Sequence, residues 1–206
     1  MVQTEMILVL GIGNLLWADE GFGVRAAEEF SRRYTCDERV TVMDGGTQGL
    51  YLLPHVQDAS RLVVFDAIDY GLAPGTMKVI LDEEVPSYMG AKQMSLHQTG
   101  FQDVLAAARL TGHYPRSLVL IGVQPVELKD YGGSLREPVR AQLDPAVEIA
   151  ADWLRRWGVA ISPRHAAEGG DINSAALGLA AYEQSRPSEA DACREADPRF
   201  LLRRDD

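Results

Sequence analysis

Met6-Ile7-Leu8-Val9-Leu10 is an uninterrupted apolar run, and Gly11-Ile12-Gly13-Asn14 follows it directly. A run without polar alternation is typical of a strand that is buried on both faces, as in a parallel sheet covered by helices. Two later runs, Arg61–Phe65 and Ser117–Val123, have the same character. The sequence therefore predicts a sheet whose central strands are buried on both sides.

The segments between these runs predict helices and further strands. Apolar residues at helical spacing indicate helices over about residues 19–33, 50–56, 99–110 and 138–157. Two shorter β-prone segments, residues 39–43 and 76–81, predict additional strands, the second of them at an edge. This order indicates an α/β fold with three layers: a mostly parallel twisted sheet with helices on both faces.

The chain has 206 residues, which suits one domain with its own core and is short for two. We expect a single domain over residues 1–160. After Gly158 the sequence becomes small, polar and charged, so residues 161–206 are expected to form a poorly ordered tail from about Pro163. Within that tail, Ile172–Tyr182 could form a short helix.

Charge and cysteine content narrow the class of protein. The net charge of −10 argues against binding to nucleic acid or to an anionic membrane surface. Cys36 and Cys193 lie far apart and form no CxxC pattern, which fits a reducing compartment. The first residues lack the basic region of a signal peptide, and no apolar run reaches membrane-spanning length. We expect a cytoplasmic, monomeric protein without a membrane segment.

Three polar residues stand at strand ends or helix starts: Glu20, Asp66 and His97. Glu20 opens the first predicted helix, Asp66 ends the third predicted strand, and His97 precedes the helix expected from Thr99. Because the carboxyl ends of parallel strands border one crevice, we expect these side chains to lie close together. Two carboxylates and an imidazole suit a divalent transition metal, so all three are candidate catalytic and metal-binding residues.

Each of these residues also has a local interpretation. Asp19 and Glu20 are favoured by the macrodipole at a helix start, and Asp19 fits an N-cap, which leaves Glu20 to face the crevice. Asp66 could cap the turn after its strand. The segment Ser95-Leu96-His97-Gln98 resembles a capping box, and the positive end of that helix favours a neutral, metal-binding imidazole.

The first glycines also suggest a dinucleotide-binding turn. Gly11 and Gly13 follow the first strand, and Asp44 stands where a ribose-binding acid would be expected. However, Leu16 replaces the third glycine of that pattern, and the loop continues to Asp19 before the helix begins. A phosphate-binding turn leads directly into its helix, so an NAD-binding oxidoreductase is the weaker interpretation.

Four motifs in order resemble those of the hydrogenase maturation endopeptidases, proteases that act on the large subunit of nickel–iron hydrogenases. They are Gly11-x-Gly13-Asn14-x-Leu16-x-x-Asp19-Glu20-Gly21-x-Gly23, Asp44-Gly45-Gly46-Thr47-x-Gly49, Asp66-Ala67-Ile68 and Ser95-Leu96-His97-Gln98. The resemblance extends from about Met6 to Trp157. It is strongest to members that serve uptake, membrane-bound-type hydrogenases, with Gly112 and Pro115 also matching.

The resemblance implies an endopeptidase that removes a C-terminal extension from the large-subunit precursor after nickel insertion, with the bound nickel as the recognition element. Nickel is then carried by the precursor, and no resident organic cofactor is expected. The family's metal-binding positions correspond to Glu20, Asp66 and His97. The positions associated with substrate recognition correspond to Asp44, Gly45, Gly46 and Thr47.

The chemistry of cleavage has several interpretations. The sequence contains no HExxH or GxSxG motif and no cysteine at a helix start, which leaves metal-assisted or aspartic-type hydrolysis. In our hypothesis, Glu20, Asp66 and His97 complete the coordination of nickel held by cysteines of the precursor, and the metal or a carboxylate activates water. One alternative is a resident catalytic zinc with the same ligands. Another is a two-carboxylate aspartic mechanism, in which Asp66 acts with Asp19 or with Glu20. A non-enzymatic nickel chaperone that only binds the precursor is another.

Overall fold

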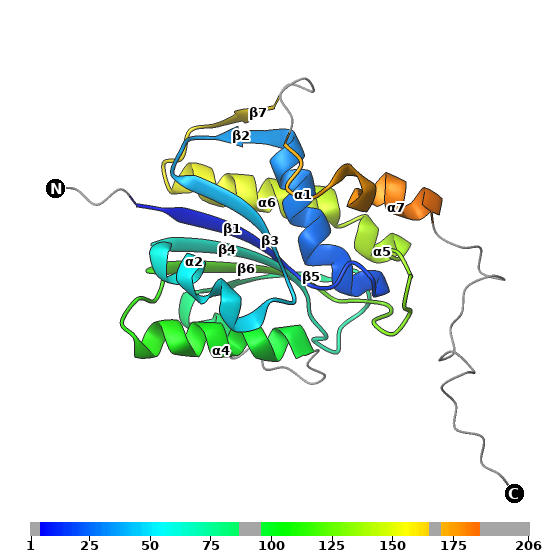
Figure 1. Ribbon diagram of the computed structural model, residues 1–206, viewed down its shortest axis with the longest axis horizontal. Helices are drawn as coiled ribbons and strands as arrows, with labels where there is room; N and C mark the ends of the chain where they lie inside the picture. The colour runs from blue at the N-terminus through cyan, green and yellow to red at the C-terminus, as the bar shows by residue number, and fades with distance from the viewer. Residues whose placement is uncertain (1–4, 87–95, 165–169, 186–206) are drawn as a thin grey trace, which may run out of the picture.

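The computed structural model describes residues 5–86, 96–164 and 170–185, with the backbone alone for residues 96–99. Its centre is a five-stranded sheet in the order β3-β1-β4-β6-β5 (Figure 1). The strands are β1 (Ile7–Ile12), β3 (Val40–Gly46), β4 (Arg61–Ala67), β5 (Met77–Leu81) and β6 (Ser117–Val123). Strands β3, β1, β4 and β6 are parallel, whereas β5 pairs antiparallel with β6 at an edge.

Helices cover both faces of this sheet. Helices α1 (Phe22–Arg33) and α6 (Leu143–Arg156) contribute to the apolar cluster on one face. Helices α2 (Leu53–Asp58) and α4 (Leu96–Leu110) contribute to the cluster on the other face. Figure 1 shows the two pairs on opposite sides of the strands. The α/β fold with three layers is therefore confirmed.

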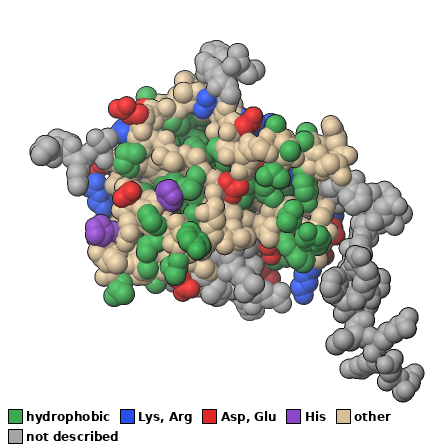
Figure 2. Space-filling view, viewed as in Figure 1, with side chains coloured by type: hydrophobic (Ala, Val, Ile, Leu, Met, Phe, Trp, Pro, Cys, Tyr) green, Lys and Arg blue, Asp and Glu red, His purple; other side chains and the backbone are tan. Residues whose placement is uncertain are grey.

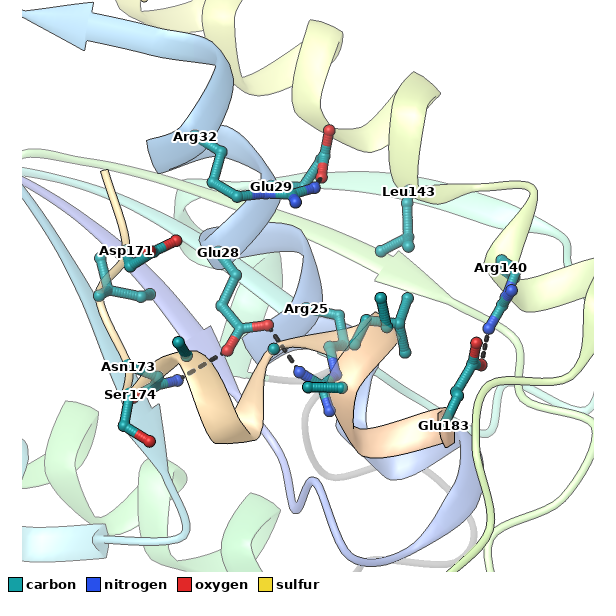
Figure 3. Close-up of a pocket in the computed structure, with 16 residues that line it drawn as sticks. Arg25, Glu28, Glu29, Arg32, Arg140, Leu143, Asp171, Asn173, Ser174 and Glu183 are labelled. Atoms are coloured by element: carbon teal, nitrogen blue, oxygen red, sulfur yellow. Dashed lines mark hydrogen bonds and ion pairs between the residues drawn. The ribbon is translucent and has the colours of Figure 1, made fainter. Parts of the chain in front are cut away.

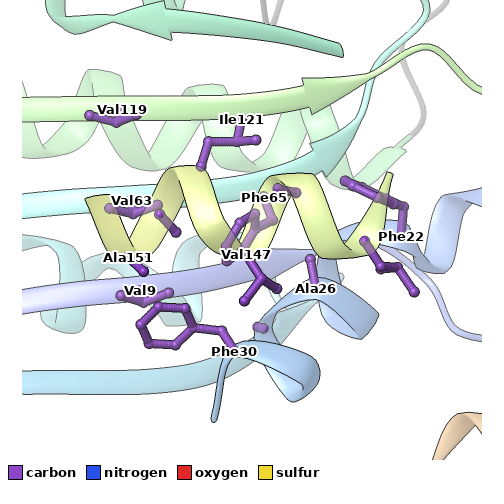
Figure 4. Close-up of a cluster of buried hydrophobic side chains, with 14 of the residues drawn as sticks. Val9, Phe22, Ala26, Phe30, Val63, Phe65, Val119, Ile121, Val147 and Ala151 are labelled. Atoms are coloured by element: carbon purple, nitrogen blue, oxygen red, sulfur yellow. The ribbon is translucent and has the colours of Figure 1, made fainter. Parts of the chain in front are cut away.

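The alternation of side chains along β4 explains why the strand sequences are apolar throughout. Val63 and Phe65 pack into the cluster with α1 and α6, whereas Leu62 and Val64 pack into the cluster with α2 and α4. Figure 4 shows the first cluster, in which Phe30 of α1 lies beside Val9 of β1. Full burial of one such large side chain stabilises the fold by about 1.5–3 kcal/mol. Both faces of the strand therefore require apolar residues.

Two predicted helices differ in their bounds. The helix expected over residues 138–157 is divided into α5 (Glu137–Arg140) and α6. Pro145 explains the division, because it has no N–H to donate to Ala141 and is tolerated only in the first turn of a helix. Helix α4 begins at Leu96, earlier than the expected Thr99. Among the described residues, no helix is long and apolar enough to cross a membrane.

Parts of the segment after residue 160, for which a poorly ordered tail is expected, form regular elements in the described residues. Strand β7 (Ile161–Pro163) pairs antiparallel with β2 (Tyr34–Cys36), a strand that the sequence pattern did not indicate. Farther on, η4 (Ala175–Leu177) and α7 (Leu179–Ser185) replace the single helix expected over Ile172–Tyr182. Both follow from partners that lie more than a hundred residues earlier, because β2 supplies the pairing edge and α1 supplies the packing surface.

Candidate active site

The register of the parallel strands brings two of the predicted residues to one edge of the sheet. Gly11 of β1 lies beside Asp44 of β3 on one side and beside Phe65 of β4 on the other. On the far side of β4, Asp66 pairs with Gly122 of β6. Asp44 and Asp66 thus stand at the carboxyl ends of strands on either side of β1, where ligands bind in open α/β sheets.

Two glycines allow α1 to lie directly on the strands at this edge. A Cβ on Gly11 would come within 2.4 Å of the Gly23 carbonyl oxygen, which no real side chain tolerates. A Cβ on Gly23 would come within 2.2 Å of the carbonyl oxygens of both Ile12 and Phe65. Because the helix backbone touches β1 and β4 here, the short helix η1 (Ala18–Gly21) contacts β4, which carries Asp66. Glu20 is thereby held at the same edge.

Gly13 lies in the loop between β1 and η1 and allows a backbone conformation that a residue with a side chain would not adopt. Its φ is +139°, and a Cβ there would lie 1.8 Å from the Glu20 carbonyl oxygen. That same oxygen accepts the N–H of Asn14 at 3.1 Å. The glycines of this motif therefore serve close backbone packing around Glu20, which accounts for them without a dinucleotide phosphate.

Asp66 is fully buried in β4. Its neighbours Val64 and Ile68 belong to the cluster under α2 and α4, so alternation directs Asp66 toward that face. Burial of a carboxylate in a protein interior is unfavourable unless it has polar or charged partners. A buried aspartate at the end of an apolar strand is thus a strong candidate for a functional group.

His97 lies in the first turn of α4, as its helix-start position predicts. Close backbone contact ties this end of α4 to η2 (Gly49–Leu52), because a Cβ on Gly100 would lie 3.2 Å from the Cα of Gly49. Helix η2 follows the Asp44–Thr47 loop, so the start of α4 lies near the chain that leaves the carboxyl edge. The orientation of the His97 side chain and the expected capping box at Ser95 lie outside the described residues.

Asp19 does not cap its own helix, which corrects that interpretation. The N-cap residue of η1 is Trp17, and no side chain bonds the helix start. Instead, the fully buried Asp19 carboxylate accepts three backbone N–H groups from the chain after β6. Oδ2 accepts from Val126 at 2.8 Å and Glu127 at 2.9 Å, and Oδ1 accepts from Arg136 at 2.7 Å. Asp19 therefore anchors a loop.

The Asp44-Gly45-Gly46-Thr47 segment forms the end of β3 and the turn after it. A Cβ on Gly45 would come within 2.7 Å of Leu10 Cδ1, and Gly46 has a φ of +46°, so both glycines are required by the backbone. Asp44 Oδ2 accepts a hydrogen bond from Asn173 Nδ2 at 2.8 Å. Sequence reasoning missed Asn173, because no local signal connects two residues so distant in the chain.

Cys36 offers no alternative nucleophile, and the described side chains offer no alternative metal cluster. Burial raises the pKa of the Cys36 thiol to about 11, so it stays protonated near neutral pH and is not an activated nucleophile. Within residues whose side chains the structure describes, no three His, Cys, Asp or Glu groups are placed to hold a metal ion. The expected set of Glu20, Asp66 and His97 includes a side chain beyond that description and stays a prediction.

The fold and site define an α/β protein with a sheet covered on both faces, acidic residues at its carboxyl edge and glycines that bring α1 against the strands. The chain belongs to the hydrogenase maturation proteases: the family model with that description matches residues 24–153.

Individual relatives agree with this assignment. The chain is 62% identical over 195 residues to the hydrogenase expression/formation protein HupM of Azotobacter chroococcum mcd 1, covering 95% of this chain and 93% of that protein. It is 44% identical to the hydrogenase 2 maturation protease of Escherichia coli K12, covering 78% of this chain and 97% of the other. The solved structure of the hydrogenase maturating endopeptidase HybD from E. coli superposes with a TM-score of 0.73 at 43% identity, over 77% of this chain and 98% of HybD.

Proposed function

We propose that this chain is the endopeptidase that removes the C-terminal extension of a nickel–iron hydrogenase large-subunit precursor after nickel insertion. The observation that carries the proposal is the arrangement at the carboxyl edge in a member of the maturation protease family. Asp44 of β3 and Asp66 of β4 stand at the carboxyl ends of the two strands that flank β1, and close backbone packing at Gly11, Gly13 and Gly23 holds Glu20 at the same edge. Such an edge can receive an extended segment of a protein substrate.

Glu20, Asp66 and His97 would recognise the nickel that the precursor carries. Two carboxylates and an imidazole match the donor preference of a divalent transition metal of intermediate softness. With only three ligands from the protease, the remaining positions are left to cysteines of the precursor. Nickel then acts as a checkpoint in the substrate: a precursor without the metal is not aligned and is not cut.

Hydrolysis itself would use a carboxylate at this edge as the general base for water, with or without help from the metal. The three backbone N–H groups on Asp19 support its exclusion from that role, since both of its oxygens are occupied in holding the chain after β6. Of the two-carboxylate pairings, Glu20 with Asp66 is therefore favoured. The Asp44–Thr47 loop would contact the substrate beside them.

A protein partner also fits the surface. On the face shown in Figure 2, acidic, basic and apolar side chains are interspersed, and the net charge is −10. Such a surface favours a protein substrate over nucleic acid. We further propose that the protease acts as a monomer in the cytoplasm.

The decisive experiment mixes the purified protein with nickel-loaded and nickel-free precursor and reads both by intact mass. Shortening of the loaded precursor alone is the expected result. Equal shortening of both would keep the protease and remove the nickel checkpoint. Complex formation without any shortening would favour a non-enzymatic chaperone instead, and nucleotide binding would point to the oxidoreductase interpretation.

A further inference from the structure

The segment of residues 170–185, called here the C-terminal segment, lies beyond the family match and packs on α1. A pocket of about 480 Å³ separates parts of the two (Figure 3). Charged side chains around it are paired with one another: Arg25 with Glu28, Arg32 with Glu29, and Arg140 with Glu183. These charged side chains are thus already paired with one another.

Asn173 in this segment bridges two carboxylates from different elements. Its amide nitrogen donates to Glu28 Oε1 of α1 at 2.9 Å and to Asp44 Oδ2 of β3 at 2.8 Å. Both partners are acceptors when ionised, so the amide NH2 group, with its two donors, is the chemically consistent group to face them. Without Asn173, the two negative charges would face each other at close range without a donor between them.

The position of the Asp44 carboxylate depends on the hydrogen bond from Asn173. Among the described residues, its other oxygen, Oδ1, is buried without a hydrogen-bond partner. The bond from Asn173 to Oδ2 is therefore the described side-chain contact that compensates Asp44 for its loss of water. A carboxylate that loses such a bond is expected to move toward solvent.

The C-terminal segment is fixed well enough to hold Asn173 in place. Arg25 of α1 is only 4% exposed and bonds Glu28 and the carbonyl oxygen of Leu177. Its guanidinium also lies 5.5 Å from the centre of the Tyr182 ring. Detachment of the segment would remove partners from a buried cation, which is strongly unfavourable. A second contact joins Ser134 Oγ to Glu183 Oε1 at 2.6 Å.

We propose that Asn173 is a positioning residue for the Asp44–Thr47 loop, so that the C-terminal segment forms part of the substrate-recognition structure of this protease. The inference rests on the proposed function, in which that loop contacts the precursor. Asn173 acts through Asp44, and does not itself take part in cleavage. Asn173, which lies outside the range matched by the family model, thus sets the conformation of a loop within that range.

The test compares Asn173→Ala and Asn173→Asp with Ser174→Ala, a matched control in the same segment whose side chain is exposed and makes no cap hydrogen bond. In cleavage of the nickel-loaded precursor, Asn173→Ala should raise KM roughly tenfold with kcat unchanged, the size expected for one hydrogen bond to a charged group. Asn173→Asp should raise KM further. In an Asp44→Asn background, Asn173→Ala should add no further effect.

A second measurement does not depend on cleavage. The N–H of Gln48 donates to the Gly45 carbonyl at 3.1 Å, so its hydrogen exchange reports on the loop. Exchange should be faster in Asn173→Ala than in Ser174→Ala. Equal exchange in the two variants would overturn the inference, even if the wild-type protein cuts no precursor and the proposed function fails. Faster exchange with an unchanged KM would overturn the recognition role.

Discussion

Gly23 of α1 lies so close to Phe65 of β4 that a Cβ on the glycine would be 2.2 Å from the Phe65 carbonyl oxygen. Phe65 immediately precedes Asp66, and Gly23 follows Glu20 by three residues. One backbone contact therefore couples the helix that begins after Glu20 to the strand that carries Asp66. The spacing of the candidate carboxylates depends on the absence of a single methyl group.

Substitution of Gly23 by alanine should separate these elements. We expect Gly23→Ala to lower the free energy of unfolding by about 3 kcal/mol, at the upper end for overpacking, and to reduce cleavage. Gly112→Ala is the control, because its φ is +75° but nothing lies within 4 Å of an added Cβ. It should cost about 1 kcal/mol from backbone strain alone. Urea denaturation measures both, and equal losses would contradict the packing argument.

Asp66→Asn and His97→Ala should abolish cleavage of the precursor while the fold is retained. The reason is that each change removes a proposed nickel ligand or base without altering the sheet. Intact mass measures cleavage, and circular dichroism confirms the fold. A folded, active Asp66→Asn variant would remove Asp66 from the mechanism.

Asp19→Asn should instead lower the stability of the protein, whereas Asp66→Asn and His97→Ala should abolish cleavage with the fold retained. An asparagine amide offers one acceptor oxygen in place of two, so the hydrogen bonds on one side of the carboxylate are lost. We expect a decrease of about 1–3 kcal/mol in the free energy of unfolding, measured by urea denaturation. Cleavage should fall only as far as the altered loop disturbs the site. Complete loss of cleavage at undiminished stability would restore Asp19 as a catalytic candidate.

The acid stability of the protein should depend on Asp37. Hydrogen bonds from the Arg39 guanidinium, 2.8 Å and 3.0 Å long, lower the pKa of this carboxyl from 3.8 to about 2. Because the folded state has the lower pKa, the contribution to stability is present above about pH 4 and is lost as the pH falls through about 2.

Asp37→Asn should accordingly destabilise the protein near neutral pH and weaken its loss of stability between about pH 4 and 2. The free energy of unfolding across this range is the measurement. Asp152→Asn, which removes an exposed ion pair with Arg155, is the matched control and should change the pH dependence little. An unchanged acid profile in Asp37→Asn would contradict the assignment.

The metal content of the purified protein tests whether nickel is cargo of the precursor. Protein prepared without added nickel should contain far less than one equivalent of metal by elemental analysis, because in this proposal the nickel arrives bound to cysteines of the precursor. Stoichiometric, tightly held zinc would instead support a resident catalytic metal. In that case, removal of zinc by a chelator should stop cleavage of every precursor.

Much of the fold could be predicted from local sequence. The apolar runs around Val9, Val63 and Val119 predict strands buried on both faces, and the structure places each of them in the parallel sheet. The position of Asp66 at the end of such a strand could also be predicted, because alternation and strand length are local properties. The ordered motifs indicated the family before any contact was known.

The sequence by itself determined the strand pattern, the family and the candidate residues, because apolar periodicity and motif order are encoded in neighbouring positions. Only the tertiary structure decided that Asp19 anchors the chain near Val126, that β7 pairs with β2, and that Asn173 joins Asp44 to Glu28. These partners are separated by more than a hundred residues. Their contacts arise when packing of α1 on the sheet brings distant backbone and polar groups together, and no local pattern records that geometry.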